Sequence, residues 1–454
     1  MNNQSYSAKP YGYIPRILLG VLFAISTDIH AAGFALTEKS GSSIGNAFAG
    51  AGTAAEDAST ILSNPAGLSR IRGTQLVVAG YAIRSSIDFH DHDSRTLIGA
   101  GVGDPLLSGG SGGDAGDLAF VPNLYLAADV NDHVKAGLGV HSPFGLKTEY
   151  DSRWVGRYEA IKSGLKTINI NPAVSLQVSD RLSLGFGLNA QYIGAELSNA
   201  VDFGSICAMA GVGSCAAPQA RDGYLALKGK DWSWGYNLGM LLEPVPGTRL
   251  GLAYRSKVAH HLKGDAEFSN VPTELAGLPD LANGAIKADI TLPETALISV
   301  LHQLNDRWSI MGDVLWTRWS QFNELRVERN DGALLGLTAE HWRNVRRYAL
   351  GATYLYSDAW KLRFGVAYDE SPVPEMFRTP RVPDQNRWVL GLGANFKASA
   401  SDSLDIGYLH VFLKDASLNL NHPVVPAQPA ITQSLAGGYD SDVDVLSLQY
   451  THVF

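Results

Sequence analysis

Stretches in which apolar and polar residues alternate one by one recur from about Thr74 to the end of the chain. In LSLGFGLNAQY (182–192), every second residue is Leu, Phe, Ala or Tyr, and the positions between them hold Ser, Gly, Asn or Gln. TININPAVSLQV (167–178), LRFGVAY (362–368) and WVLGLGANF (388–396) repeat this pattern. A period of two over about ten residues predicts β-strands whose two faces meet different surroundings.

The connections between these strands fall into two length classes. We assign six short turns, VND, SD, PVPGT, ND, SDAW and SASDS, with seven long polar or Gly-rich loops between them. The long loops lie near 87–116, 147–163, 204–222, 268–285, 329–342, 371–386 and 421–438. Short turns at one rim and long loops at the other are typical of outer-membrane barrels, which have even strand numbers. The sequence therefore predicts an all-β fold, a transmembrane antiparallel β-barrel of about 14 strands over 74–454.

The last residues, DVLSLQYTHVF (444–454), indicate what the two faces of such a strand meet. We expect the apolar face to contact lipid and the polar face to line the lumen. This strand should pair with the first one, because an open sheet edge is untenable in hydrocarbon. The terminal Phe454 resembles the signal that the barrel-assembly machinery reads. Tyr192, Trp388 and Tyr450 are candidates for the aromatic girdles at the membrane interfaces.

The N-terminus predicts export from the cytoplasm. Lys9 and Arg16 precede the apolar stretch ILLGVLFAIS (17–26), and IHAAGF follows, so residues 1–31 are predicted to be a secretory signal peptide. The alternative is a buried N-terminal helix. No later stretch holds the 18 or so consecutive apolar residues that a spanning helix requires. The protein is therefore expected to be secreted, periplasmic or a membrane barrel.

Charge and cysteine content exclude some classes of partner. The net charge of -8 and the pI near 5.8 argue against nucleic acid, which needs a concentrated basic surface. Cys207 and Cys215 lie eight positions apart, so a local disulfide is expected in an oxidising compartment, and a CxxC metal site is excluded by this spacing. HDH (90–92) is better explained as a solvated polar loop than as a metal site. No cofactor or metal is predicted.

Residues 32–73 form the candidate hatch of the barrel. A lumen enclosed by about 14 strands would leak unless something filled it, because 16 to 18 strands already enclose an aqueous channel. The segment is rich in Ala, Gly and Ser, lacks two-residue alternation and precedes the first strand. Within it, NPAG gives Asn64 and Pro65 a turn or extended geometry. The alternative is a flexible N-terminal extension.

The stretch GLGVHSPFGL (137–146) falls where the third strand is expected. Pro143 cannot donate a hydrogen bond to a strand ladder, and Gly145 lets the backbone bend. In a closed barrel, such a break is a place where the wall can part. The alternative is that Pro143 only begins the loop at the rim.

The chain resembles the FadL-type family of long-chain fatty acid and hydrocarbon transporters of Gram-negative outer membranes. The resemblance rests on AGFALTEKSGSSIGNAFAGAGTAAEDASTILSNPAG (32–67), PFGLKTEYDSRWVGRYEA (143–160), TRWSQF (317–322) and DESPVPEMFRTPRVPDQNRW (369–388). It implies a 14-stranded barrel, an N-terminal hatch in the lumen and an inward kink in the third strand, through which cargo leaves sideways into the membrane. Carried over residue by residue, the hatch motif and the kink fall on Asn64, Pro65 and Ala66, and on Ser142, Pro143, Phe144 and Gly145.

The resemblance implies passive transport of hydrophobic molecules through an apolar lumenal pocket, with long-chain fatty acids as the expected cargo. Such a pocket binds cargo by burying apolar area and releases it into hydrocarbon at little cost. The alternative cargo is an aromatic hydrocarbon or an alkane. Besides the cargo, the expected partners are outer-membrane lipid and lipopolysaccharide, and the barrel-assembly machinery during biogenesis. The expected location is the outer membrane of a Gram-negative bacterium.

Candidate cargo-binding residues follow from the chemistry of a fatty acid. Its carboxylate would favour a lumenal cation, for which Arg157, Arg346 and Arg347 are candidates. Phe34 and Phe48 could line the apolar pocket, as could Phe144 at the kink. The alternative for the arginines is an ion-pair network that holds a loop or the lumen. The alternative for the aromatic residues is packing of the hatch and kink.

Two other classes of protein were considered. GSSIG (41–45) and GGSGG (109–113) match the G-x-S-x-G motif of lipases by letters, but neither follows a strand and opens a helix as that motif requires. The chain is therefore not expected to be an enzyme. A general diffusion porin would lack both the hatch and the Pro143 break. A steady large single-channel conductance would favour the porin, and near silence the plugged transporter.

Overall fold

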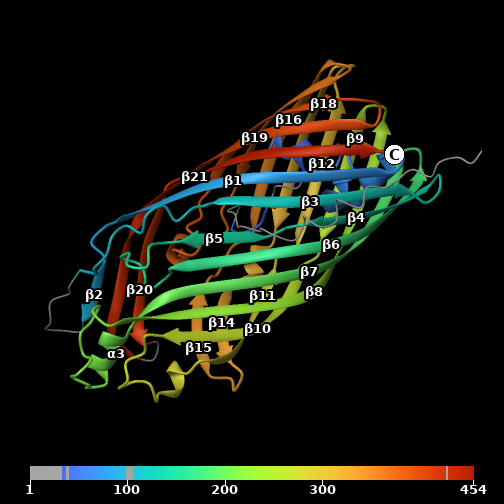
Figure 1. Cartoon of the computed structure of the whole chain (residues 1–454). Helices are drawn as coiled ribbons and strands as arrows, with labels where there is room; N and C mark the ends of the chain where they lie inside the picture. The colour runs from blue at the N-terminus through green and yellow to red at the C-terminus, as the bar shows by residue number, and fades with distance from the viewer. Residues whose placement is uncertain (1–32, 37–39, 99–105, 426–427) are drawn as a thin grey trace, which may run out of the picture.

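Fourteen antiparallel wall strands close into a barrel, and the N-terminal segment lies inside it (Figure 1). The computed structural model describes residues 33–36, 40–98, 106–425 and 428–454, so the signal peptide predicted for 1–31 lies outside the described residues. All 21 strand segments belong to one sheet. The all-β barrel predicted from the two-residue alternation is confirmed.

Eight of the wall strands are continuous. They are β1 (Gln75–Asp91), β3 (Leu118–Asp129), β6 (Lys162–Ser179), β7 (Leu182–Asp202), β8 (Asp222–Val245), β17 (Trp360–Asp369), β18 (Arg387–Lys397) and β21 (Gln428–Val453). An additional short segment, β2 (Arg95–Ile98), lies in the first long connection and pairs with β21.

The other six wall strands are each interrupted and consist of two segments. They are β4 (Val134–His141) with β5 (Gly145–Glu149), β9 (Thr248–Arg255) with β10 (Val258–Ser269), β11 (Gly284–Leu292) with β12 (Thr295–Gln303), β13 (Trp308–Thr317) with β14 (Glu324–Arg329), β15 (Leu334–Ala339) with β16 (Val345–Ser357), and β19 (Asp402–Leu413) with β20 (Ala416–Val425). Three of these interruptions matter for the site, because Phe144, Trp319 and Trp342 lie in them and pack around Phe34.

The barrel closes through a long ladder between β1 and β21. It runs without a register shift from Gln75 opposite Val453 to Asp91 opposite Gly437. Every backbone group along this seam is thus paired inside the sheet, as the hydrocarbon core of a membrane requires. The predicted pairing of the last strand with the first is confirmed.

The two faces of the strands differ as the alternation predicts. On β21, Leu446, Leu448 and Tyr450 point outward and are exposed, whereas Ser447 and Gln449 point inward and are buried. Aromatic pairs such as Tyr192 with Trp232 and Tyr368 with Trp388 pack on the outer surface, with ring centroids 5.5 and 5.0 Å apart. Among the described residues, no helix has the length and apolar character needed to cross a membrane.

One predicted loop is wrong. Residues 421–438 were expected to be a long loop, but β20 and the beginning of β21 form the two arms of a hairpin there, with Asn421 opposite Ser434. A strand that extends beyond the membrane needs no apolar face, so its polar composition resembles that of a loop. The long connections near 87–116 and 329–342 likewise contain strand segments, β2 and the β14–β15 hairpin.

The hatch consists of three short helical pieces, α1 (Gly41–Ile44), α2 (Thr60–Ser63) and the 3-10 helix η1 (Pro65–Arg70). It lies against wall positions that have no side chain. A Cβ added to Gly365 would lie 2.0 Å from the backbone carbon of Asn46, and one added to Gly407 would lie 1.9 Å from Ile44. The remaining short helices are α3 (Phe203–Met209), η2 (Pro279–Leu281), η3 (Trp319–Gln321) and η4 (Glu375–Phe377).

Candidate functional site

The hatch motif connects the hatch to the wall at β8. Asn64 is fully buried, and its side-chain oxygen accepts a hydrogen bond from Ala66 N (3.1 Å), which caps η1. Its amide donates to Gly52 O within the hatch (2.8 Å) and to Met240 O of β8 (3.0 Å). A Cβ at Gly239 would lie 2.0 Å from Asn64 Oδ1, so Asn64 can approach β8 this closely only because residue 239 is a glycine. All polar atoms of the Asn64 side chain are therefore used in positioning the hatch.

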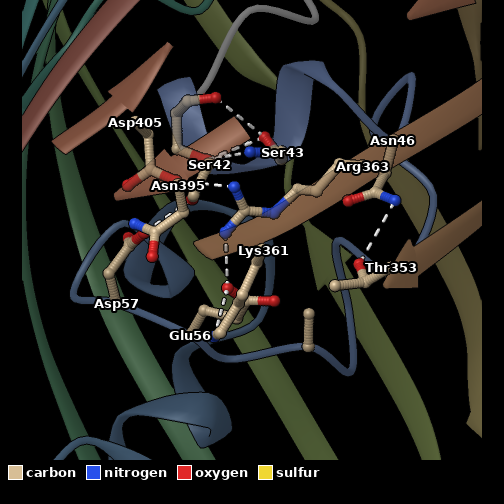
Figure 2. Close-up of polar contacts among 12 residues, drawn as sticks. Ser42, Ser43, Asn46, Glu56, Asp57, Thr353, Lys361, Arg363, Asn395 and Asp405 are labelled. Atoms are coloured by element: carbon tan, nitrogen blue, oxygen red, sulfur yellow. Dashed lines mark hydrogen bonds and ion pairs between the residues drawn. The ribbon is translucent and has the colours of Figure 1, made fainter. Parts of the chain in front are cut away.

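Charged and polar contacts fix the other side of the hatch to β16, β17 and β19 (Figure 2). The fully buried Arg363 of β17 donates to Glu56 Oε2 of the hatch (2.7 Å) and to Asp405 Oδ1 of β19 (2.6 Å). Asn46 contacts Thr353 Oγ1 of β16 at 3.5 Å. Because the guanidinium bridges a hatch carboxylate and a wall carboxylate, this network holds the hatch in the lumen.

The third wall strand is interrupted between β4 and β5, and Thr167 of β6 supplies the missing hydrogen bonds. Its hydroxyl accepts from Phe144 N (3.0 Å), and its carbonyl accepts from Ser142 Oγ (2.7 Å). The ladder between β3 and the third strand ends at Leu124 opposite Val140, and within the described residues no ladder joins β3 to β5. On the β3 side of the break, the third strand therefore has no ladder of hydrogen bonds beyond Val140 in the described part of the chain.

The first described residues of the hatch bind this break. Leu36 N donates to Pro143 O (2.9 Å), and Gly145 N donates to Phe34 O (3.0 Å). The hatch segment 33–36 thus takes the place of a strand neighbour for the interrupted third strand. If segment 33–36 moves, either these two hydrogen bonds are lost or residues 143–145 move together with the segment.

Phe34 is the centre of a cluster of aromatic rings. Its ring centroid lies 4.8 Å from Trp319, 5.4 Å from Trp342, 5.7 Å from Phe322 and 6.2 Å from Phe144. Each of these partners comes from an interruption of a wall strand: β4 to β5, β13 to β14, or β15 to β16. The strand breaks therefore build one apolar cluster around the hatch.

An apolar pocket of about 100 Å³ lies beside Phe34 in the lumen. It is lined mainly by inward-facing residues of β6, β7, β8, β10 and β11, among them Leu165, Ile193, Leu197, Leu227, Leu262 and Ile286. Leu146 of β5 also lines it, so the pocket extends to the break in the third strand. Such an apolar pocket with few polar groups is the usual form of a site for a hydrophobic ligand.

Four ionisable residues line this pocket. Lys228 of β8 and Lys287 of β11 are exposed and pair with Glu196 and Glu328, whereas the other two lie in connections outside the membrane-spanning strands. Arg381 is in the connection between β17 and β18, and Glu340 is in that between β15 and β16. Burial raises the pKa of Glu340 to about 8, against the opposing effects of the Trp342 Nε1–H donor and Arg381. Burial also lowers the pKa of Arg381 to about 10, so its guanidinium remains charged at neutral pH.

Arg381 has only neutral oxygens as hydrogen-bond partners. It donates to Ser163 Oγ (3.1 Å) and to the carbonyls of Lys162 (3.2 Å) and Ser198 (3.5 Å). Within the described residues, no carboxylate lies within ion-pair distance of it. At neutral pH, Glu340 is largely protonated because its pKa is about 8. The pocket therefore holds a half-buried cation on which Glu159 acts from beyond ion-pair distance.

The structure brings Phe34 and Phe144 to this site but not the arginines expected from the sequence. Arg157 is buried in the loops, where it donates to Asp222 Oδ2 (2.7 Å) and Tyr158 Oη (2.7 Å). This contact corresponds to the loop-holding alternative, and Arg157 does not line the pocket. Arg346 points outward on β16 and is exposed.

Arg347 and Phe48 belong to the hatch contact instead of the pocket. Arg347 donates to Ala47 O of the hatch (2.9 Å), lies 4.0 Å from Asp369 and stacks over the Phe48 ring at 5.3 Å. The inward position of Arg347 follows from strand alternation. Its partner could not be read from the sequence, because it depends on how the hatch folds back.

Sequence reasoning missed Arg381 and Glu340 of the pocket. Arg381 lies in the stretch 369–388 on which the family resemblance partly rests, so a charged residue inside that motif was the available signal. Glu340 follows the strand segment β15, where only an inward turn of the chain buries it. Neither feature has a two-residue period that could reveal it.

Cys207 and Cys215 are joined by a disulfide within the connection between β7 and β8, with Cα atoms 5.6 Å apart. Both are buried in a small cluster with Phe203 and Leu275, and neither lines the pocket. The bridge therefore closes a loop on α3 and has no contact with the lumenal site.

A closed antiparallel barrel with apolar outward residues and an apolar pocket beside an interrupted strand is the architecture of an outer-membrane barrel protein. The chain belongs to the outer membrane protein transport protein family (OMPP1/FadL/TodX), whose model matches residues 22–454. It is therefore a member of a Gram-negative outer-membrane family that transports hydrophobic molecules.

Individual relatives agree with this assignment. The chain is 31% identical to a long-chain fatty acid transport protein of Escherichia coli O6:H1, over 85% of this chain and 88% of that protein. It superimposes on a Pseudomonas aeruginosa FadL homologue with a TM-score of 0.84 and 27% identity, covering 93% of this chain and all of the other. The Pseudomonas putida toluene transporter TodX shares the fold, with a TM-score of 0.66 at 18% identity, covering 93% of this chain and all of the other.

Proposed function

We propose that this protein carries long-chain fatty acids passively across the outer membrane, through the pocket at Phe34 and out through the break in the third strand. The observation that carries the proposal is the half-buried Arg381, a cation at a largely apolar pocket whose hydrogen-bond acceptors among the described residues are all neutral. A fatty acid supplies both features that this pocket lacks, a carboxylate for the guanidinium and an alkyl chain for the apolar walls.

Glu340 supports the same assignment. An ionised Glu340 would neutralise Arg381 and repel an incoming carboxylate. With a pKa of about 8, Glu340 is instead largely protonated at neutral pH. The guanidinium therefore remains available, and a buried anion and cation gain considerably from each other in a dry site.

Phe34 must move when cargo binds. A pocket of about 100 Å³ is smaller than the several hundred cubic ångströms that small-molecule sites usually enclose. Phe34 fills the adjoining space, and its carbonyl accepts from Gly145 of the break. We infer that cargo displaces the Phe34 ring and, through this hydrogen bond, loosens the third strand at Pro143.

The proposed exit is lateral. The missing ladder between β3 and β5 supports a passage beside Phe144 and Ser142, which are bound mainly through Thr167 on the other side. Cargo that leaves there enters hydrocarbon, so the apolar area that it uncovers is buried again at once. No energy source is needed for such movement down a gradient.

The decisive experiment compares oleate binding by the purified protein and by R381Q, using tryptophan fluorescence or displacement of a fluorescent fatty acid. Loss of a charge-assisted hydrogen bond should weaken oleate binding by about 10- to 100-fold. R346Q, which removes an exposed arginine outside the pocket, is the matched control and should bind as the wild type does. A folded R381Q protein with unchanged oleate affinity would contradict the proposal.

A second candidate cargo is a neutral aromatic hydrocarbon. The rings of Trp319, Trp342 and Phe322 around Phe34 favour it, since aromatic rings pack well against one another. A hydrocarbon makes no use of Arg381. Wild type and R381Q should then bind toluene or an alkane equally, and unchanged binding of both oleate and hydrocarbon in R381Q would favour this cargo.

The further proposed partners are outer-membrane lipid and lipopolysaccharide, and the barrel-assembly machinery during biogenesis. The outward apolar residues of β21, which end in the exposed Phe454, support recognition of this strand by that machinery. Replacing Phe454 with Ser should reduce the amount of folded barrel in the membrane, whereas replacing the exposed loop residue Met376 with Ser should not.

A further inference from the structure

Four lysines form a row across the outer surface of the barrel. Strand register places Lys166 of β6 opposite Gly194 of β7, and Gly194 opposite Lys230 of β8. Lys230 is opposite Lys263 of β10, and Lys263 is opposite Lys287 of β11. The row crosses five neighbouring strands, so it spans about 19 Å at the usual spacing of 4.7–4.9 Å between strands. Strands β6, β7 and β8 are drawn side by side in green in Figure 1.

The row is electrostatically unbalanced. All four lysines are exposed, and Lys287 has an ion pair with Glu328 (3.2 Å). Within the described residues, Lys166, Lys230 and Lys263 have no ion pair. Like charges directly opposite each other destabilise a sheet. Three neighbouring strands nevertheless carry Lys230, Lys263 and Lys287 in register, which indicates a selected function for the charge.

The row borders a hollow in the outer surface. A depression of about 550 Å³ is lined by Lys166, Lys230 and Lys263. Its lining also holds Lys147, Lys162 and Lys228, which are paired with Asp117 or Glu196, and the carboxylates of Glu196 and Asp265, so lysines outnumber carboxylates there by six to two. Gly194 has no side chain, so the space between Lys166 and Lys230 stays open. A Cβ at this position would occupy that space, 3.1 Å from Tyr192 Oη and 3.6 Å from Lys166 Cε. A phosphate group could therefore approach several ammonium groups at once.

The row lies at the height of the lipid headgroups. Two residues closer to the short turns, and on the same outward face, Tyr192 packs against Trp232. Such aromatic residues mark the interface between hydrocarbon and headgroups. Trp234, still closer to the short turns, is 70% exposed on the lipid face. The lysines thus stand just beyond the membrane interface on the long-loop side, which is the cell exterior in outer-membrane barrels.

The opposite wall has the opposite charge. On the outward face of β1 and β21, Asp88 lies opposite Asp440, and Asp442 and Asp444 follow on β21, with the exposed Arg84 opposite Asp444 as the cation in this group. The positive row is therefore confined to one side of the barrel, in a chain with a net charge of -8. A general requirement for solubility or for long-loop solvation would not produce this asymmetry.

We propose that the lysine row on β6, β8, β10 and β11 is a binding site for the phosphorylated headgroup of lipopolysaccharide in the outer leaflet. Anionic lipid attracts lysines at the membrane surface, and lipid A carries its phosphates at the level where this row stands. The acyl chains of the same molecule would lie along the exposed apolar residues below the row, including Trp232 and Trp234. This inference rests on the outer-membrane location and is independent of the cargo.

The test measures binding of bisphosphorylated lipid A to the full-length, detergent-purified protein by native mass spectrometry. The triple variant K166Q/K230Q/K263Q removes the three lysines without ion pairs. It should weaken lipid A binding by about 100-fold, since each lysine near an anionic lipid contributes about fivefold. Dephosphorylated lipid A should bind weakly to both proteins.

The matched control is K257Q/K397Q/K414Q, which removes three exposed lysines elsewhere and changes the net charge equally. It should bind lipid A as the wild type does. Heat-modifiable migration on a gel verifies that each barrel is closed, and the single variant K230Q, with an expected loss of about fivefold, replaces the triple variant if that fails to fold. Unchanged binding by the folded lysine variant, an equal loss in the control, or equal wild-type affinity for phosphatidylglycerol would each overturn the proposal.

Discussion

Buried charges in this barrel have two separate roles, which individual side-chain contacts distinguish. Arg363 and Arg347 point into the lumen from wall strands and bind oxygens of the hatch or of neighbouring strands. Arg381 reaches the lumen from a connection and has only neutral acceptors. A buried charge costs several kcal/mol unless it is compensated. Among the described residues, Arg255 likewise donates only to neutral oxygens, those of Asn189 and Leu62, but Arg381 is the one of the two that lines the pocket at Phe34.

The Glu340 carboxyl should make oleate binding depend on pH. Below its pKa of about 8, Glu340 is protonated and Arg381 is available to the ligand. As the pH rises through 8, Glu340 ionises, competes for Arg381 and repels the oleate carboxylate. Oleate affinity should therefore fall by about tenfold between pH 7 and pH 9. In E340Q the affinity should stay constant over this range, and an equally steep decline in E340Q would exclude Glu340 as the cause.

Arg363 should contribute strongly to stability. Its side chain is 2% exposed and holds both Glu56 and Asp405, so R363Q leaves the buried Asp405 without its cation and Glu56 with Lys361 alone. We expect a loss of about 3–5 kcal/mol in the free energy of unfolding, measured by urea denaturation in lipid. K361Q is the matched control: Lys361 contacts the same Glu56 at 3.4 Å from an exposed position and should cost less than about 1 kcal/mol.

Residue roles could be predicted from the sequence only where they follow from chain direction and alternation. The inward position of Arg347 and the outward positions of Leu446 and Tyr450 depend on strand periodicity alone. The role of Arg381 depends on a connection that folds back over the lumen. No periodic signal encodes such a fold, so the sequence pointed to Arg157 instead, which binds Asp222 in the loops.

At the scale of elements, the interrupted strands build the aromatic cluster around Phe34. A break exposes backbone groups, and each break here is compensated locally. At the third strand, Thr167 accepts from Phe144 N and donates to its carbonyl (2.7 Å), while the hatch accepts from Gly145 N. The backbone groups at the break in the third strand are therefore hydrogen-bonded, so the break does not destabilise the barrel through unpaired polar groups.

Repairing the third strand should stop transport without stopping binding. In P143V/G145V, two strand-forming residues replace the proline and glycine, so β4 and β5 can continue as one strand paired with β3. Fatty acid uptake by whole cells should fall to near background, while oleate binding by the purified protein should persist. P172V, which replaces an outward proline within the continuous strand β6, should transport normally. Undiminished uptake in P143V/G145V would argue against a lateral exit.

Elements were predictable to different degrees. Strands that cross hydrocarbon need an apolar face, so β7 and β21 follow directly from the sequence. The hairpin of β20 and β21 beyond the membrane has no such constraint, and its residues 421–438 resemble a loop. The break after His141 was predictable as a hypothesis, because Pro143 cannot donate to a ladder. The breaks at Trp319 and Trp342 contain no proline, so the aromatic cluster that they build around Phe34 was not foreseen.

At the scale of the whole molecule, the hatch is held on several sides of the barrel. Asn64 binds β8, Arg363 connects Glu56 to β17 and β19, and the Asp313 carboxylate of β13 accepts from Gly50 N and Ala51 N, both at 2.9 Å. Each neutral hydrogen bond contributes about 1 kcal/mol, and charged ones more. Removal of the entire hatch would therefore cost far more than displacement of the segment at Phe34.

Transport should accordingly continue with the body of the hatch locked in place. Thr53 Oγ1 of the hatch lies 2.9 Å from Ser299 Oγ of β12, so T53C/S299C places two sulfurs near bonding distance. The oxidised variant should take up fatty acid at nearly the wild-type rate and should remain silent in single-channel recordings. Uptake that stops on oxidation and returns on reduction would show instead that the hatch body must move. Since Thr53 lies well away in sequence from 33–36, the bridge leaves Phe34 free to respond to cargo while the lumen stays closed to water.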